Sequence, residues 1–339
     1  MKGALLVSSF LLAACLLQAL PTEITYTEGD ASERLKSGRA RDAAIGDVLN
    51  TGDSLKTGVD GRAELDQKGV ILKISPNTVF TLLERYQSGS TTSDSVISVA
   101  LGSVKLHYDK LTGKEPLVRT GGATAGARGT DFSVFAGADG SSLIVVDSGE
   151  VTVQAAGGSV NLSPNEGVEV PLGQPPGQKI TVHSDQVDYR TWNDGKLASM
   201  LADPAAAMGT IESAMAGYIA NVKDYAAQFE ESDQRLLAEQ QKRRDIFNQQ
   251  GKDVAAKYQS DVVTPLAIQT GYLVLNVRYY SLAALSLRRY VGGRLYVFLK
   301  SRYITNLADP AWTGFLDRYQ AVLGSFEESI VPHLVEGDI

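Results

Sequence analysis

The sequence predicts an α+β protein in which an N-terminal all-β domain of the jelly-roll or sandwich type precedes an α-helical hairpin or bundle. From residue 24 to about 182, short runs that alternate apolar and polar side chains are separated by turns rich in Gly, Asn and Asp. Strands spaced by roughly 8–12 residues in this way are typical of sandwiches, jelly rolls and barrels. After about residue 188 the glycine turns thin out, and apolar residues recur at helical spacing.

The β-domain is expected to be a series of short strands. Alternation of apolar and polar residues marks the runs 24–27, 62–65, 70–74, 78–82, 96–101, 103–106, 142–146, 150–153, 159–162 and 168–170. Gly102 separates two of these runs and suggests a hairpin, and Asp147-Ser148-Gly149 suggests another tight turn. Phe132 and Val134 lie on the apolar side of their run, so both are expected to enter the core.

Three helices are expected after the β-domain. The first covers residues 205–248 and ends at Gly251, and the second opens at Pro265, because proline is favoured in the first turn of a helix. Gly292-Gly293 is expected to kink or end the second helix, and Asp309-Pro310 to open a last helix that runs to about residue 330. Met208 and Met215 are expected to be core residues of the first helix.

Changes in composition divide the chain into four parts. Residues 1–20 are expected to be a signal peptide, 21–170 the β-domain, 171–187 a linker that begins with PLGQPPG, and 188–339 the helical domain. At 339 residues, with 43% hydrophobic and 21% charged residues, the chain is globular and long enough for two cores.

The net charge of −7 argues against nucleic-acid binding by the whole chain, which requires a basic field. The three histidines are far apart and there is one cysteine, so no zinc spacing exists, and neither a metal nor a cofactor is expected.

The N-terminal segment predicts export to the periplasm or cell envelope. Lys2 is followed by an uncharged apolar run from residue 4 to 20, and polar sequence begins near Thr22. Leu12-Ala13-Ala14-Cys15 resembles a bacterial lipobox, which makes Cys15 a candidate lipidation site. The alternative is cleavage near Ala19, which leaves a soluble chain without cysteine, and the apolar residues after Cys15 favour it.

One glycine-rich segment is a candidate binding loop and a candidate domain signature. It contains Gly126, Arg128, Gly129, Thr130 and Asp131. A strand follows it rather than a helix, and it lacks the Gly-Lys-Ser/Thr sequence, so it is not a phosphate loop. Arg128 could bind an anionic ligand, but we favour a structural role in which it pairs with a carboxylate and pins a tight turn. No nucleophile or histidine accompanies the acidic residues, so no enzyme activity is expected.

A second candidate site is a cationic, aromatic stretch. Residues 262–308 contain no Asp or Glu, and tyrosines are interleaved there with Arg278, Arg288, Arg289, Arg294, Lys300 and Arg302. Such a face could bind an anionic partner, namely phospholipid headgroups, glycan phosphates or an acidic protein. The alternative, which we favour, is that it packs against the acidic helix segment 230–245 and balances its charge.

Several sequence blocks in a fixed order resemble the FecR domain. The blocks are 51–58 with 61–65, Ser75-Pro76-Asn77-Thr78, Leu101-Gly102-Ser103-Val104, 125–132 and 149–153. The resemblance implies a β-rich, jelly-roll-like fold outside the cytoplasm. The family is named for a transmembrane regulator of iron-citrate uptake that senses a loaded transporter and acts on a sigma factor. Only Met1-Lys2-Gly3 precede the apolar segment here, so a cytoplasmic arm, and with it the iron-regulation role, is not expected.

Three functions are consistent with these features. The first is a non-enzymatic envelope protein whose β-domain binds or senses a protein or glycan partner and whose helical domain docks or oligomerises. The alternative is the periplasmic sensing component of a transmembrane signalling system. A second alternative is a glycan-acting hydrolase with paired carboxylates.

Overall fold

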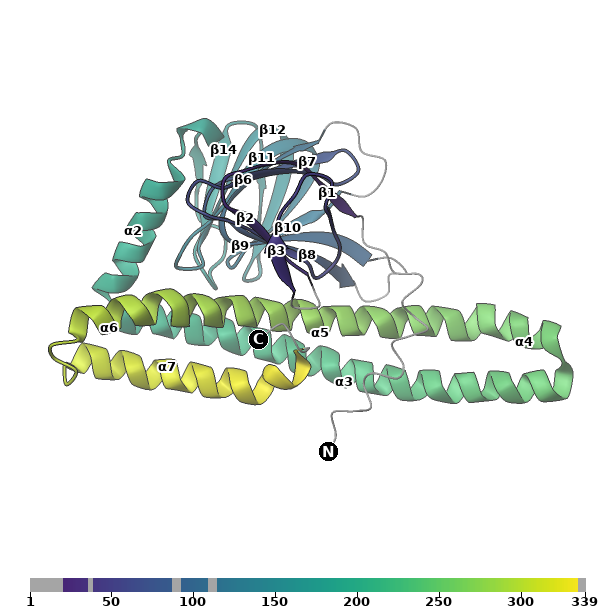
Figure 1. Ribbon diagram of the computed structural model, residues 1–339. Coiled ribbons are helices and arrows are strands. Elements are labelled where there is room, and N and C mark those ends of the chain that lie inside the picture. Colours follow the sequence, from purple (N-terminus) through teal and green to yellow (C-terminus); the bar gives the residue numbers. More distant parts are fainter. Residues whose placement is uncertain (1–20, 36–38, 87–92, 109–114, 335–339) are drawn as a thin grey trace.

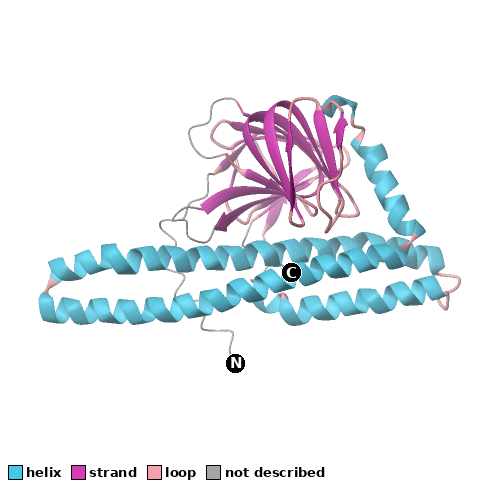
Figure 2. Ribbon diagram, turned by 180° about the vertical axis from the view of Figure 1, so that it is seen from behind, coloured by secondary structure: helices cyan, strands magenta, loops and turns pink. Residues whose placement is uncertain are grey.

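The computed structural model describes residues 21–35, 39–86, 93–108 and 115–334. A curved β-body lies on a layer of long helices, and a shorter helix runs from the body to the layer (Figure 1). Figure 2 shows the same two parts from behind. The order of a β-rich part followed by a helical part confirms the predicted fold class.

All strands of the body hydrogen-bond into one strongly curved sheet that folds over a single core. Its main path runs β15-β14-β12-β11-β10-β9-β7-β6-β1-β4. The strands are β1 (Thr22–Glu28), β2 (Ala31–Arg34), β3 (Ala40–Asp42), β4 (Val48–Leu49), β5 (Ser54–Thr57), β6 (Arg62–Asp66), β7 (Val70–Ile74), β8 (Val79–Tyr86), β9 (Ser93–Tyr108), β10 (Leu117–Arg119), β11 (Thr124–Ala136), β12 (Ser142–Ala155), β13 (Gly158–Leu162), β14 (Glu166–Val170) and β15 (Lys179–Thr181).

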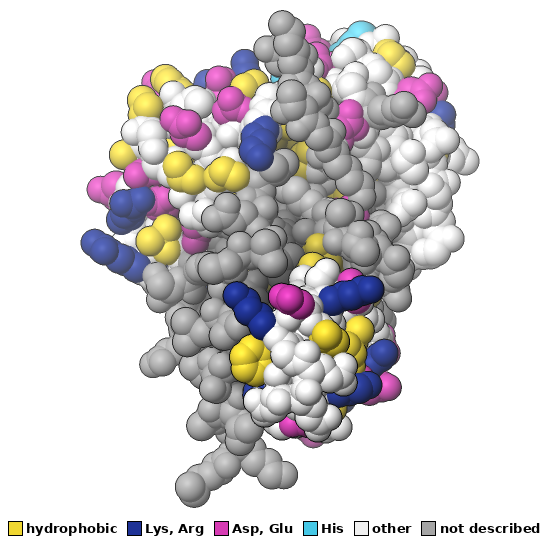
Figure 3. Space-filling model, turned by 90° about the vertical axis from the view of Figure 1, so that its right-hand side faces the viewer, with side chains coloured by type: hydrophobic (Ala, Val, Ile, Leu, Met, Phe, Trp, Pro, Cys, Tyr) yellow, Lys and Arg dark blue, Asp and Glu magenta, His cyan; other side chains and the backbone are white. Residues whose placement is uncertain are grey.

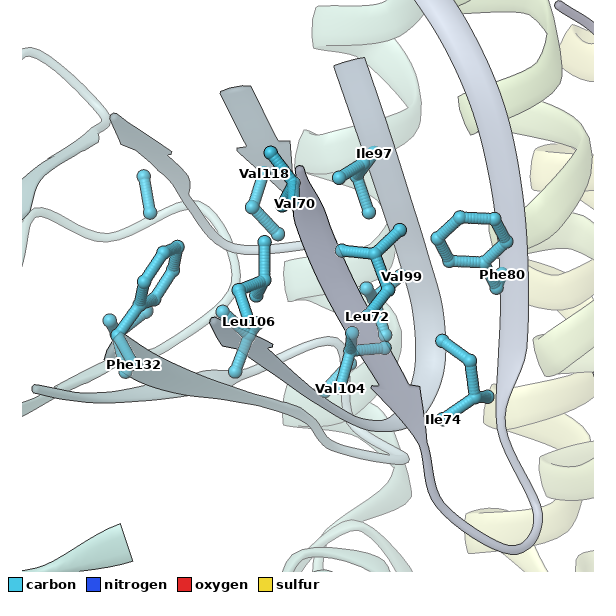
Figure 4. Close-up of a cluster of buried hydrophobic side chains, with 14 of the residues drawn as sticks. Val70, Leu72, Ile74, Phe80, Ile97, Val99, Val104, Leu106, Val118 and Phe132 are labelled. Carbon is cyan, nitrogen blue, oxygen red and sulfur yellow. The ribbon is translucent and has the colours of Figure 1, made fainter. Parts of the chain in front are cut away.

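The core lies inside the curve of the sheet, and alternate residues of each strand supply it (Figure 4). Phe132 and Val134 are buried there, which confirms the expectation from their alternation. Phe80 from β8 and Leu106 from β9 come from other parts of the sheet and enter the same cluster. The single core explains how many short strands form one body.

The hairpin predicted at Gly102 is wrong, because β9 passes through this residue as one bent strand. Before Gly102, β9 pairs with β8 and β10, and after it with β7 and β11. Gly102 has φ +100°, and a Cβ built there would lie 2.4 Å from Cα of Thr78. Glycine is therefore required where β9 crosses between two groups of neighbours.

The tight turn predicted at residues 147–149 is also wrong, because β12 continues through it. The register between β11 and β12 shifts there, opposite residues 128–131. Gly129 and Gly149 have φ of +59° and +77°. Glycine at positive φ suits a β-bulge as well as a turn, which is why the sequence pattern was ambiguous.

The helical layer has three long parts. The helix α3 (Pro204–Gln250) packs against a second long helix, whose segments are given below, and α7 (Pro310–Ser329) packs on α3. Asp203 and Asp309 cap α3 and α7 ahead of a first-turn proline, as helix starts prefer. The layer has its own core, which contains Met208 and Met215 as expected, with Phe315 and Phe326 from α7.

The second long helix begins earlier and ends later than the sequence predicts. Gly251, with φ +89°, ends α3 as expected, and the chain then forms α4 (Lys252–Tyr258), a π-helical η2 (Gln259–Val263), α5 (Thr264–Tyr290), a π-helical η3 (Val291–Tyr296) and α6 (Val297–Tyr303). Pro265 lies in the first turn of α5, just after η2, where the helix geometry changes. Gly292-Gly293 lies inside η3 and does not end the helix.

Residues 171–187, between the body and the helical layer, were expected to be a linker. The division of the chain at these residues stays a prediction. Part of the stretch forms β15 at the edge of the sheet, and η1 (Ser184–Gln186) follows. Asp188 then caps α2 (Tyr189–Ala202), which descends to the helical layer (Figure 1). Among the helices of the described residues, none combines the length and apolar character needed to cross a bilayer.

Substitution of Gly102 by alanine should destabilise the body strongly. The positive φ costs about 1–3 kcal/mol for a side chain, and overpacking against Thr78 adds about 1–3 kcal/mol. Gly157→Ala is the matched control, because Gly157 also has positive φ but nothing lies within 4 Å of a Cβ there. Urea denaturation should show a larger loss of unfolding free energy for Gly102→Ala, and equal losses would contradict the close-approach argument.

Candidate functional site

The outer face of β8, β9 and β10 rests on the helical layer. Leu83 and Val96, which are paired across β8 and β9, contact Tyr279 of α5 in a small buried cluster. Leu117 of β10 packs at its side. This apolar patch is much smaller than the cores of the two parts, so polar groups must contribute to the contact.

A buried arginine lies at the centre of this contact. Arg119 at the end of β10 is 8% exposed, and its guanidinium carbon lies 4.0 Å from the ring centre of Tyr279, 5.4 Å from Tyr218 and 5.5 Å from Tyr280. We call these three rings the tyrosine cage. Tyr218 comes from α3 and the other two from α5, so one residue of the sheet joins both long helices. Tyr218 also donates a 3.4 Å hydrogen bond to the carbonyl of Gly121.

Arg119 keeps its positive charge in this place. Burial lowers the pKa of the guanidinium, but the surrounding tyrosines outweigh burial, and the pKa lies above its ordinary value. The structure records no ion pair for Arg119 with any residue that it describes, and Nη1 is buried without a hydrogen-bond partner. A charge buried in this way is costly unless something compensates it.

The contact is not fully packed on either side of the cage. A cavity of about 50 Å³ is lined by Arg119, Ser98 and Thr120, together with Tyr218 and Ala283. A groove of about 370 Å³ lies between β2, β5 and β8 of the sheet and α5. Ser98 and Ala283 line both spaces. The sheet and the helices therefore touch closely at few points.

The groove has a polar character. Glu33 is buried in its wall and pairs with Arg41, and its other oxygen has no hydrogen-bond partner. Arg34, Lys56 and Arg289 are exposed residues of the lining. The groove thus combines one paired carboxylate with three cations.

A larger cleft of about 800 Å³ lies where β9 and β11 meet η1 and α2. Tyr189 holds the two sides together, because its hydroxyl accepts from the N–H of Gly102 and donates to the carbonyl of Ala136, each at 2.9 Å. Asp188 lines the cleft but caps α2, and hydrogen bonds from Thr191 lower its pKa. This carboxylate is therefore committed to the helix start.

The start of η1 is fixed to the sheet by a group formed by Asp147, Lys105 and Ser184. Lys105 Nζ lies 2.8 Å from Asp147 Oδ2, and Ser184 Oγ donates to the same oxygen at 2.7 Å. Partial burial raises the pKa of Asp147, but the bonds from Lys105 and Ser184 outweigh it and hold the pKa below its ordinary value.

The glycine-rich signature residues lie in a strand and not at a tight turn. Gly126, Gly129, Thr130 and Asp131 belong to β11, at the bulge opposite β12. At this bulge, Thr130 Oγ1 donates a hydrogen bond to the carbonyl of Glu150 at 3.0 Å. Asp131 Oδ1 lies 2.6 Å from Nδ1 of His107. The predicted tight turn is therefore wrong, while any binding role of these residues stays a prediction. The Arg128 side chain and Cys15 lie outside the described residues.

The cationic residues predicted to form a partner face lie in different surroundings. Arg288 lies 5.1 Å from the ring centre of Phe326 on α7, whereas Arg289 lines the groove beside the sheet. Lys300 lies over Tyr296, and Arg302 lies over Tyr303 and donates to the carbonyl of Leu201 at 2.7 Å. Arg278 is half-buried in α5, and the Arg294 side chain is outside the described part. The five described side chains therefore lie in different surroundings, and a partner-binding role for these cations stays a prediction.

Sequence reasoning missed Arg119, Ser98 and the tyrosine cage. The one local signal was a charged residue directly after the apolar pair Leu117-Val118 and before a glycine turn. For metals, no group of three His, Cys, Asp or Glu side chains comes together within the described ranges.

A family model matches the middle part of the β-body. The family model described as "FecR protein" matches residues 53–152, from the turn before β5 into β12. The chain therefore contains a FecR domain, as the sequence blocks indicated. The helical layer lies outside the matched residues.

Two crystal structures of a "putative anti-sigma factor" from Parabacteroides distasonis ATCC 8503 are similar to part of the chain. They are 19% and 20% identical to it, each with a TM-score of 0.33, and the similarity covers 39% and 41% of this chain. It spans 61% and 63% of those chains, less than two thirds of their length. No curated protein matches the chain.

We predict that Arg119 and Tyr279 are energetically coupled. A double-mutant cycle of Arg119→Met and Tyr279→Leu, followed by urea denaturation, should give a coupling free energy of about 1–2 kcal/mol, because a desolvated cation lies over the ring. Tyr26→Leu is the control, since Tyr26 is an exposed tyrosine of β1. Its effect should add to that of Arg119→Met, and additivity in the Tyr279 cycle as well would disprove the coupling.

We predict that Asp147 makes stability depend on pH in the acid range. Its pKa is lowered in the folded protein, so its contribution is present above the unfolded-state pKa of about 3.9 and is lost as the pH falls through the lower folded-state pKa. The difference in unfolding free energy between wild type and Asp147→Asn should shrink as the pH falls from neutral to strongly acid. A difference that stays constant with pH would rule this out.

Proposed function

We propose that this protein is a non-enzymatic regulatory protein of the cell envelope. Its FecR domain binds or senses a partner protein, and the helical layer conveys that state to the next component. The FecR domain is the observation that carries the proposal, because the family is named for a transmembrane regulator. The apolar segment in residues 1–20 supports export, and lipidation at Cys15 would place the protein at a membrane surface.

The docking between body and helices supports a signalling role over simple binding. The contact uses a buried cation and a small apolar patch, and it is flanked by a groove and a cavity. Such a contact is weaker than a continuous apolar core and is suited to two arrangements of similar free energy. A partner that binds one arrangement better would shift the population.

The far end of the helical layer is a suitable place for the output. We call residues 232–270 the arm; Ser232 Oγ and Thr270 Oγ1 lie 2.7 Å apart at its base, and Leu236, Val263 and Leu266 form its own small core. The arm extends past the FecR domain (Figure 1), and its end exposes basic, acidic and hydrophobic side chains together (Figure 3). Phe247 is 54% exposed there. A protein partner of mixed character fits this surface better than a purely anionic one.

A deletion strain tests the proposal. Loss of the protein should change the transcript levels of a defined set of genes severalfold, and wild type should restore them. Tyr279→Leu, which weakens the docking, should restore them incompletely although the protein is present at normal level. Tyr26→Leu is the matched control and should restore them fully.

Two results would count against a regulatory role. The first is an unchanged transcript profile in the deletion strain across envelope conditions. The second is full restoration by a variant that lacks the arm.

A further inference from the structure

A full positive charge is buried beside a cavity at the sheet–helix contact. Only 8% of the surface of Arg119 is exposed to solvent. The aromatic rings of the tyrosine cage face its guanidinium, but no carboxylate of the described residues pairs with it, and Nη1 has no hydrogen-bond partner. The guanidinium is hydrogen-bonded to the Tyr279 side chain, so Nη1 is the group that lacks a partner among the described residues.

The strand register places a second donor next to Arg119. β9 and β10 are parallel, and Arg119 lies directly opposite Ser98. Side chains opposite each other in neighbouring strands point to the same face. Both residues line the cavity. The cavity thus has a guanidinium and a hydroxyl donor on one wall.

We propose that this cavity binds a small monovalent anion, of the size of chloride, between Arg119 and Ser98. The anion accepts hydrogen bonds from the guanidinium and from the Ser98 hydroxyl and neutralises the buried charge. The proposal is independent of the regulatory role, because a halide can bind whether or not the protein controls gene expression.

The size and lining of the cavity select the class of ligand. A volume of about 50 Å³ exceeds what one water molecule requires, about 10–15 Å³, and it holds a halide ion with little additional water. A sugar acid such as gluconate is several times larger than this volume. A cation is excluded by Arg119 itself. A halide therefore fits better than a carboxylate ligand, a metal ion or a phosphate ester.

Bound halide would also strengthen the docking of the helices. The cavity is lined by Arg119 and Ser98 of the sheet on one side and by Tyr218 and Ala283 of the helices on the other. An ion that binds only when these walls are together stabilises that arrangement in proportion to RT ln(1 + [L]/Kd). Halide concentration would then shift the equilibrium between docked and undocked helices.

Halide binding can be tested on the whole chain with sodium bromide as the probe. Crystals soaked in bromide should show an anomalous peak within hydrogen-bond distance of the Arg119 guanidinium. In solution, the melting temperature should rise with bromide or chloride but not with gluconate at equal ionic strength, because gluconate is too large for the cavity. Arg119→Met should abolish the halide-dependent rise.

Two further variants make the result specific. Ser98→Ala removes one donor with little change in volume, and the apparent Kd for bromide should rise about tenfold or more. Arg62→Met, which removes an exposed arginine of β6, is the matched control and should bind bromide as wild type does. The proposal is overturned if no peak lies at Arg119, or if bromide and gluconate give the same melting curves. Those results would mean that the tyrosine cage and water alone compensate the charge.

Discussion

A positive charge buried between sheet and helices constrains both parts of this protein. Arg119 is held where three aromatic rings from two helices converge, and this arrangement requires α3 and α5 to lie at a fixed height against β10. Undocking would return the guanidinium to water, so the buried charge adds little net attraction, but its contacts with the rings are made in one geometry only. The arginine therefore makes the position of the helices specific, while the small apolar cluster around Leu83 and Val96 supplies only part of the attraction.

The long strand β9 makes that contact possible. Both halves of β9, before and after Gly102, contribute residues to the core. The half that faces the helices and the half that faces the cleft therefore belong to one continuous strand. Tyr189 then bonds to the same glycine and fixes the start of α2 at the bend. Two of the connections between the β-body and the helices, through α2 and through Arg119, are thus tied to β9 and its neighbour β10.

The sequence predicts those features that depend on neighbours along the chain. Alternation assigns Phe132 to the core, and an aspartate followed by proline marks the starts of α3 and α7, because both signals are local. Gly102 was misread because its need for glycine comes from Thr78, which reaches it through the fold. The cage was missed for the same reason: Tyr218 and Tyr279 lie about 100 and 160 residues from Arg119 in the chain, and only the packing of helices on the sheet brings them together.

The length of α3 gives the docking contact a mechanical meaning. The helix passes under the FecR domain at Tyr218 and continues to Gln250, a distance of about 48 Å at 1.5 Å per residue. The part of α3 beyond the tyrosine cage is therefore long compared with the contact that positions it. A tilt of only about 10° there would carry the tip about 8 Å sideways, by the same helix geometry. A rotation too small to disturb either core would thus displace the end of the arm by several ångströms.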